Sequence, residues 1–285
     1  MRAPQTFARI ARACAVLALF PLIAFGAIQG GSWSLAPTDQ ADRVQFSLQG
    51  SQGDDHFSTS SPWKLADLQG LDWAAAAKHD VSFSIVRDAG TIECKGFVQE
   101  QRGAGLFTFQ PNPQYLPEMA KLGYSFEGKE LLSATIFDVS FDFARSMQSA
   151  AVRGLDAGKL FAFRIHGVTP QFIRDLRSAG IEAADAGRLI AFRIHGVTPE
   201  FVSELHGAGI NVTDEGELIA FRIHGVSPKF VGEIDRLGYA HAPPDQLIAL
   251  RIHGITPEYI EGLRSKGLQN LTLDQLISLR IHGVD

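Results

Sequence analysis

The chain repeats one tetrapeptide at a fixed interval. Arg-Ile-His-Gly begins at five positions, each 29 residues after the last: Arg164, Arg193, Arg222, Arg251 and Arg280. Such a period without insertions is typical of repeat arrays, in which each unit packs on its neighbours and not on a central core. One period upstream, residues 135–147 keep the apolar positions but lose the arginine and histidine. We interpret that segment as a degenerate copy.

Each unit predicts two short helices. In one, Thr198 is a good N-cap, Pro199 suits the first helical position, and the helix ends by Gly209. In the other, Thr213 or Asp214 caps a helix that ends at Gly225. Apolar residues surround most of this second helix, which predicts neighbours on both of its sides.

A helix pair of this size cannot bury its apolar face alone, so the units are expected to stack. The sequence therefore predicts an α-solenoid of 29-residue helix-hairpin repeats over residues 111–285.

Residues 42–110 have a different pattern. Apolar and polar residues alternate in several short runs, which indicates a small antiparallel β-rich unit of about four strands. These runs are 44–49, 81–86, 91–97 and 106–109. The polar segment 50–62 is expected to be a solvated loop, and residues 67–78 a short helix. The predicted fold class is α+β, with the β-rich unit preceding the α-solenoid.

Residues 1–30 are typical of an export signal. Arg2, Arg9 and Arg12 precede the uncharged apolar run 13–28. The run is shorter than a comfortable membrane span of about 18 to 20 residues, so a cleaved signal peptide and a retained N-terminal membrane anchor both stay open. We expect an exported protein, periplasmic or anchored in the cytoplasmic membrane and facing outward. After cleavage Cys94 would be the sole thiol, which excludes an intrachain disulfide.

The charge of the chain disfavours nucleic acid as a partner. The formal net charge is −5 and the isoelectric point is about 6.0, whereas DNA- and RNA-binding proteins usually carry a basic surplus. Gly-Val-Thr-Pro between two helices is similar to the loop of helix-hairpin-helix DNA-binding modules. That loop usually has a second glycine where this chain has Thr198, whose hydroxyl would occupy the free amides.

The repeated arginines and histidines are the candidate binding residues. They are Arg164, His166, Arg193, His195, Arg222, His224, Arg251, His253, Arg280 and His282. An acid follows three of the arginines after eleven residues, as Glu204 follows Arg193, which favours an ion pair that braces each helix corner. The alternative is a basic rail for a repeating anionic partner.

The histidines have three interpretations. Each ring would close the last turn of its helix by donating to free carbonyls. Alternatively the imidazoles form a ladder that grips a partner or senses acid pH. Metal binding is the third. Packed helices lie about 8 to 10 Å apart, whereas two ligands of one zinc ion lie within about 4 Å of each other, so adjacent repeats cannot share an ion. We expect no cofactor and no metal.

The sequence contains none of the common catalytic motifs. His-Glu-x-x-His, Gly-x-Ser-x-Gly, the phosphate-binding Gly-x-x-x-x-Gly-Lys and the dinucleotide fingerprint are all absent. We therefore predict that the protein is not an enzyme.

The segment VSFSIVRDAGTIECKGFVQEQRGAGLFTFQPNPQY, followed by LIAFRIHGVTPEF units, resembles a known family region. This is the extracytoplasmic region fused behind antibiotic-sensor-type (β-lactam sensor) membrane metallopeptidases, which also occurs as stand-alone exported proteins in several bacterial groups. The likeness covers residues 42–285. It implies a sensing or interaction module, and since this chain lacks the zinc motif and membrane helices of the peptidase, it does not imply proteolysis.

Together these features predict a non-enzymatic exported repeat protein. It would act as a protein-protein interaction or sensing scaffold in the cell envelope and bind another envelope protein along the array. The alternative is an envelope receptor for a small molecule or polyanion, with the β-rich unit or the arginines as its site. The sequence ends at RIHGVD, where the next helix would begin, so we also expect either a homodimer through this uncapped C-terminal repeat or a last helix that frays.

Overall fold

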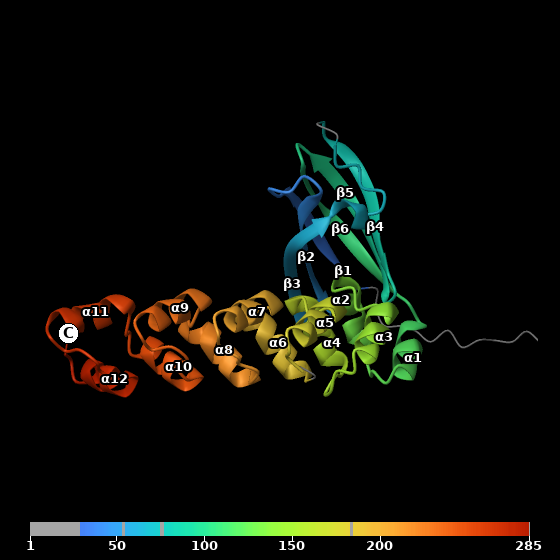
Figure 1. The fold of residues 1–285 in the computed structure, drawn as a ribbon. Coiled ribbons are helices and arrows are strands. Elements are labelled where there is room, and N and C mark those ends of the chain that lie inside the picture. Colours follow the sequence, from blue (N-terminus) through green and yellow to red (C-terminus); the bar gives the residue numbers. More distant parts are fainter. Residues whose placement is uncertain (1–28, 53–54, 75–76, 183–184, 285) are drawn as a thin grey trace, which may run out of the picture.

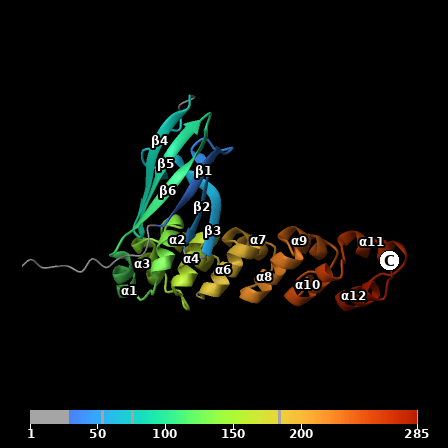
Figure 2. The same cartoon turned by 180° about the vertical axis from the view of Figure 1, so that it is seen from behind.

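The structure is a computed structural model that describes residues 29–52, 55–74, 77–182 and 185–284. A six-stranded antiparallel sheet stands on one end of a straight rod of helices (Figures 1 and 2). This arrangement confirms the predicted α+β class, with a β-rich N-terminal unit followed by a helical array. The predicted signal or anchor segment lies almost entirely outside the described residues. Within those residues, no helix is long and apolar enough to cross a membrane.

The sheet has the strand order β3-β2-β1-β6-β5-β4. Its strands are β1 (Gln29–Pro37), β2 (Arg43–Gln52), β3 (Asp55–Lys64), β4 (His79–Arg87), β5 (Gly90–Gln99) and β6 (Arg102–Pro111). The sheet curves strongly, so that side chains from its two halves meet. Phe46 of β2 and Phe83 of β4 have ring centroids 6.1 Å apart. The outer edge of β4 is covered by a backbone bridge between Ser84 and Gln69.

Trp33 occupies the middle of this curve. Its indole nitrogen donates to the carbonyl of Leu106 at 3.1 Å, and its ring lies 5.1 Å from that of Phe83. A Cβ on Gly96 would come within 2.7 Å of the indole and within 2.2 Å of a backbone oxygen of β6. Glycine is therefore required at this point of β5, since any side chain would collide with the indole and the neighbouring strand.

Several sequence predictions for the β-rich unit are wrong. The unit includes residues 29–37, ahead of the predicted start at 42, because this glycine- and serine-rich segment pairs with both β2 and β6. Within the described residues the sheet has six strands where about four were expected. Residues 50–62 were predicted as a loop, but they lie mostly in the β2–β3 hairpin, whose ladder satisfies the backbone of this polar segment. Residues 67–78 form no helix where they are described; only the 3₁₀ turn η1 (Leu65–Asp67) precedes them.

The rod consists of two rows of helices. The first row contains the rung helices, which end in the Arg-Ile-His sequence: α4 (Ala157–His166), α6 (Ala186–His195), α8 (Glu215–His224), α10 (Pro244–Ile252) and α12 (Leu273–Ile281). The second row contains the return helices: α5 (Pro170–Ser178), α7 (Pro199–Gly207), α9 (Pro228–Arg236) and α11 (Pro257–Ser265). Before them lie α1 (Tyr115–Lys121), η2 (Gly128–Glu130), α2 (Leu131–Ile136) and α3 (Phe141–Ser149).

The predicted helix caps are present. The Thr198 hydroxyl accepts from the amide of Phe201 at 3.2 Å, and the Asp214 carboxylate accepts from the amide of Glu217 at 2.8 Å. Of the two N-caps that the sequence left open, Asp214 is therefore the one used. Gly225 ends α8 in the left-handed region with φ of 71°, which an L side chain adopts only at a cost.

The units stack as the period predicts. Each rung helix packs on the next rung helix along the rod, and the return helices line up beside them (Figure 1). The buried positions recur at the same place in each unit, as Leu189 and Phe192 of α6 do with no exposed surface. Lateral contacts between copies therefore provide the core of the array.

The β-rich unit and the array are held together by specific bonds. The Asp88 carboxylate, in the β4–β5 turn, accepts from the amide of Phe141 at 2.7 Å, and Arg87 of β4 lies 3.5 Å from the carboxylate of Asp138. Helix α2 packs on β5 and β6, and one continuous cluster of buried apolar side chains runs through both parts. The joint between sheet and rod is thus a packed interface.

Candidate functional site

The candidate site is the surface formed by the rungs, by which we mean the Arg-Ile-His-Gly tetrapeptides at the ends of the five rung helices. Since equivalent helices stack side by side, each kind of rung residue forms a row along the rod. The structure thereby brings the ten predicted site residues onto one repeating surface. Three rows result, of arginine, isoleucine and histidine, and their surroundings differ.

The arginines reach back to the preceding unit. Nε of Arg193 donates to the backbone carbonyl of His166 at 3.0 Å, and the guanidinium lies 4.9 Å from the ring centroid of Phe172 in α5. Arg222 and Arg251 repeat the carbonyl contact at 3.4 and 3.3 Å, with guanidinium–ring distances of 4.8 and 5.0 Å. Each of these arginines therefore closes the end of one rung helix and stacks on the return helix that follows it.

The two terminal rungs follow the same rule. Arg164 donates to the carbonyl of Phe137 at 2.8 Å, forms an ion pair with Asp138 at 2.5 Å and lies over Phe143 at 4.9 Å. Arg280 lies over the ring of Tyr259 at 4.9 Å. The degenerate unit thus has no arginine at the rung position, where Thr135 stands, but it supplies the acceptor and the ring for the first rung arginine, Arg164.

The predicted brace between each arginine and the acid eleven residues later is wrong. Glu204 is exposed on α7, and the guanidinium of Arg193 faces the unit before it, so the two groups do not meet. Asp175 instead accepts from Gln171 at 2.6 Å, and Glu233 pairs with Lys229 at 3.7 Å. The spacing of eleven residues places the acid on the outer side of the return helix, away from the seam between units.

The missed partner is the aromatic residue. Phenylalanine or tyrosine recurs with the same 29-residue period, at Phe143, Phe172, Phe201, Phe230 and Tyr259. Its period was visible in the sequence, but an aromatic residue in an amphipathic helix is equally well explained as core. Nothing in the spacing showed that the ring serves the arginine of the following unit.

Most of the rung histidine rings do not close the last turn of their helix by hydrogen bonding to its carbonyls. His282 Nδ1 contacts the carbonyl of Ser278 at 2.7 Å, which fits the helix-closing interpretation. For the other four rungs the described residues contain no hydrogen bond from the ring, and at three of them the backbone carbonyl of the histidine accepts from the next arginine. Bonding to the free carbonyls at the ends of the rung helices, the role predicted for histidine, is therefore performed mostly by arginine. Among the described residues, no three histidine, cysteine or acidic side chains gather closely enough to hold a metal ion.

The isoleucines of the rungs are exposed. Ile165, Ile194, Ile223, Ile252 and Ile281 have exposed fractions of 53%, 56%, 56%, 55% and 59%. The sequence prediction that neighbours cover the rung helix on both sides is therefore wrong for its outer side. We call this row, together with the half-buried apolar residue one turn earlier in each helix, the isoleucine band. The five half-buried members are Phe161, Ile190, Ile219, Ile248 and Ile277.

The outer face of the first three rung helices is apolar. In α6 it consists of Gly187, Ala191 and Ile194, which lie on one side of the helix because they are separated by three and four residues. Glycine, alanine and isoleucine recur at these positions in α4 and α8, whereas α10 and α12 begin this face with an aspartate.

The return helices differ from the first three rung helices. The outer face of α7 carries Glu200, Ser203 and Glu204, all exposed. The first three rung helices thus lack, on this side, the polar surface that a solvated helix normally has.

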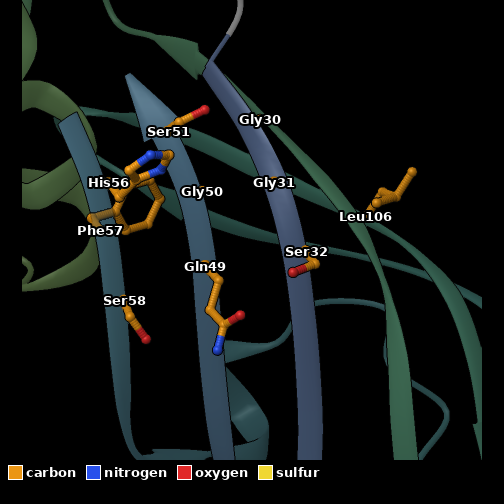
Figure 3. A pocket seen from close by; sticks show the side chains of 10 residues that line it. All are labelled: Gly30, Gly31, Ser32, Gln49, Gly50, Ser51, His56, Phe57, Ser58 and Leu106. Carbon is orange, nitrogen blue, oxygen red and sulfur yellow. The ribbon is translucent and has the colours of Figure 1, made fainter. Parts of the chain in front are cut away.

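A second candidate is a hollow of about 720 Å³ on the β-rich unit (Figure 3). Gly30 and Gly31 of β1 and Gly50 of β2 leave the backbone bare there, while His56 and Phe57 come from β3 and Leu106 from β6. Its polar side chains are serines, a glutamine and a histidine. Among the described residues, no hydrogen bond joins His56 to a serine, as a nucleophile and its base would require.

Cys94 is not a reactive thiol. It lies on β5 with no exposed surface and, among the described residues, no disulfide partner. Burial raises its pKa to about 12, so the nucleophilic thiolate is scarce at neutral pH.

No protein-family model matches the chain, and no curated protein matches it. The resemblance to the extracytoplasmic region of sensor metallopeptidases therefore stays a prediction.

Proposed function

We propose that this protein is a non-enzymatic interaction scaffold that binds another protein along the isoleucine band. The observation that carries the proposal is the row of five isoleucines, each more than half exposed, at equivalent positions of five stacked helices. Contiguous apolar surface of this kind is unusual on a soluble monomer and is typical of interaction sites. The polar outer face of the return helices shows that the array has no general shortage of polar residues.

The spacing of the band suits an extended polypeptide. Neighbouring packed helices lie about 8 to 10 Å apart, and an extended chain advances about 3.3 Å per residue. Three residues of an extended or polyproline-type segment therefore span one unit, and an apolar side chain at every third position would meet successive isoleucines. We expect the partner to present such a segment.

The charges beside the band favour an acidic partner. Each Arg-Ile-His-Gly rung contains an arginine and a histidine and no acid. The arginines contact the preceding unit, but Arg193, Arg222 and Arg251 keep exposed surface. Acidic residues between the apolar positions of the partner would be attracted to this edge and would fix its register. In this proposal the partner is an envelope protein, since residues 1–30 are typical of an export signal.

A peptide experiment tests the mode of binding. We expect the full chain to bind a synthetic peptide with leucine at every third position and aspartates between, and to bind a peptide with leucine at every second position at least about tenfold more weakly. Ile194→Ser combined with Ile223→Ser should weaken binding of the first peptide by about tenfold or more, because two central apolar contacts are lost. Fluorescence anisotropy measures both affinities.

A matched control removes exposed apolar surface elsewhere. Val86→Ser with Leu106→Ser changes two exposed residues of the β-rich unit and should leave peptide binding unchanged. Crosslinking in the native cell extends the test: the natural partner should be lost from the isoleucine variant and retained by the control. Equal capture by both variants, or hydrolytic activity of the purified protein, would contradict the proposed function.

A further inference from the structure

A separate pocket lies at the joint between the sheet and the array. It has a volume of about 370 Å³, and its walls come from β2, β3, β4, the loop after α2, and α4. Four cationic side chains line it, Arg43, Lys64, Arg87 and Arg164, against only two carboxylates. This positive excess occurs in a chain whose net charge is −5.

Arg164 is paired within the protein. Its Nη2 pairs with Asp138 at 2.5 Å and its Nε donates to the carbonyl of Phe137 at 2.8 Å. It therefore contributes charge to the wall of the pocket while two of its nitrogens are already bonded within the chain.

Arg87 is poorly satisfied. Its Nη2 lies 3.4 Å from Asp67 and its Nε lies 3.5 Å from Asp138, longer than the roughly 2.7 to 2.9 Å of charge-assisted hydrogen bonds. The Nε atom is buried and has no hydrogen-bond acceptor among the described residues. Buried donors are nearly always paired in native proteins. The position of this one in the wall of a pocket indicates an acceptor that comes from outside the chain.

The Arg43 side chain has no hydrogen-bond or ion-pair partner among the described residues. No hydrogen bond or ion pair involves its half-buried guanidinium. Its cross-strand neighbour in the β2–β3 ladder is Lys64, and directly opposed residues of an antiparallel pair project from the same face. The pocket thus combines two unpaired cations with the incompletely paired Arg87.

The remaining wall is apolar and partly aromatic. It includes Trp63, Ile136 and Phe137. Trp63 is held in place, because its indole nitrogen donates to the Ser61 hydroxyl at 3.0 Å and its ring meets that of Phe46 at 5.5 Å. A flat apolar surface therefore faces the same space as the cations.

We propose that this pocket binds a small organic anion. A carboxylate or phosphate group would accept hydrogen bonds from Arg43 and Arg87, since guanidinium groups suit both geometries. The apolar body of the ligand would lie against Trp63 and Phe137. The volume is within the range of small-molecule sites, and the pocket is distinct from the isoleucine band.

Three simple probes test the proposal: phenyl phosphate, benzoate and the neutral benzyl alcohol, each titrated into the full chain by calorimetry. We expect at least one anion to bind with a dissociation constant of about 1 mM or lower, and benzyl alcohol to bind at least about tenfold more weakly. The stronger of the two anions identifies phosphate or carboxylate as the natural group. Binding should also change tryptophan fluorescence, and Trp63→Phe should reduce that change.

The decisive variant is Arg43→Gln, which leaves the fold intact because the guanidinium has no internal partner. It should weaken anion binding by about tenfold or more. Arg102→Gln, at an exposed position in the β5–β6 hairpin, is the matched control and should bind as the unmodified chain does. Three results would each overturn the proposal. Neither anion binds at concentrations up to about 10 mM, ten times the expected dissociation constant. Alternatively, benzyl alcohol binds as tightly as the anions, or Arg43→Gln binds the anions with unchanged affinity.

Discussion

Four rung arginines, from Arg164 to Arg251, each contribute a hydrogen bond and a ring contact to the seam between units. A guanidinium over an aromatic face adds about 0.5 to 1 kcal/mol where it is exposed to water, and a hydrogen bond about 0.5 to 1.5 kcal/mol. The carbonyl that Arg193 bonds belongs to His166, at the C-terminal end of α4, where the helix dipole also favours a cation. The two contacts of one arginine therefore stabilise the packing of neighbouring units by about 1 to 2.5 kcal/mol.

A pair of double-mutant cycles separates this contact from the brace that the sequence suggested. Arg193→Ala with Phe172→Leu should show a coupling of about 0.5 to 1 kcal/mol, because the guanidinium stacks on that ring. Arg193→Ala with Glu204→Ala should be additive within about 0.3 kcal/mol. Urea unfolding followed by circular dichroism gives the four free energies of each cycle. Coupling to Glu204 and not to Phe172 would show that the arginine faces its own unit.

Single residues also show where sequence reasoning stops. The caps at Thr198 and Asp214 were predictable, because capping depends on neighbours within the same helix. The partner of Arg193 was not predictable. It is the carbonyl of His166, 27 residues away in another unit. Because the period is strict, the true pairing with the preceding unit and the false pairing with Glu204 recur equally regularly along the sequence. The exposure of Ile194 was missed because an apolar residue in an amphipathic helix is assigned to the core by default.

The rung helices depend on their glycine termini. Gly196 follows α6 with φ of 71°, and the amide of Val197 then donates back to the carbonyl of Phe192 at 2.8 Å, which turns the chain into α7. A Cβ at Gly196 would lie 2.9 Å from the guanidinium of Arg222. The same glycine therefore serves the helix end and the arginine of the next unit.

Two glycine substitutions separate these effects. Gly196→Ala should lower the free energy of unfolding by about 1 to 2 kcal/mol, because alanine is strained in the left-handed region. Gly207→Ala, at a helical position with nothing within 4 Å of the added Cβ, should leave stability unchanged or raise it by up to about 1 kcal/mol. Thermal unfolding of both variants provides the comparison. A stabilised Gly196→Ala protein would contradict the proposed role of this turn.

Among the strands, predictability follows hydrophobic contrast. β4 alternates buried and exposed residues and was predicted, whereas β3 is a run of serine, threonine and proline whose pairing with β2 supplies its order. β1 follows an apolar run and is rich in glycine, so its alternation around Trp33 and Leu35 was too short to be recognised. β1 is stabilised partly by pairing with β6, which is distant in sequence, and β3 by pairing with the adjacent β2.

Stability should decrease along the rod. The units near the sheet share its buried cluster, whereas α12 packs on α10 and has no further rung helix beyond it in the described residues. In arrays of this kind, each unit is stabilised mainly by its nearest neighbours. We expect hydrogen exchange to show high amide protection in α4 and α6 and progressively lower protection toward α12.

Protein concentration is the control for this measurement. The predicted homodimer through the C-terminal repeat would protect α12 in a concentration-dependent way, since association shifts apparent stability by mass action. Protection of α12 equal to that of α6 in a protein that sediments as a monomer would contradict the gradient.

The backward reach of each arginine makes the joints of the rod interchangeable. Whichever copy comes next offers the same guanidinium, and whichever came before offers the same carbonyl and ring. A copy could therefore be added or removed without redesigning the two surfaces that close over the gap. The length of the rod, and with it the number of isoleucines presented in a row, can vary while the sheet and its junction pocket stay as they are.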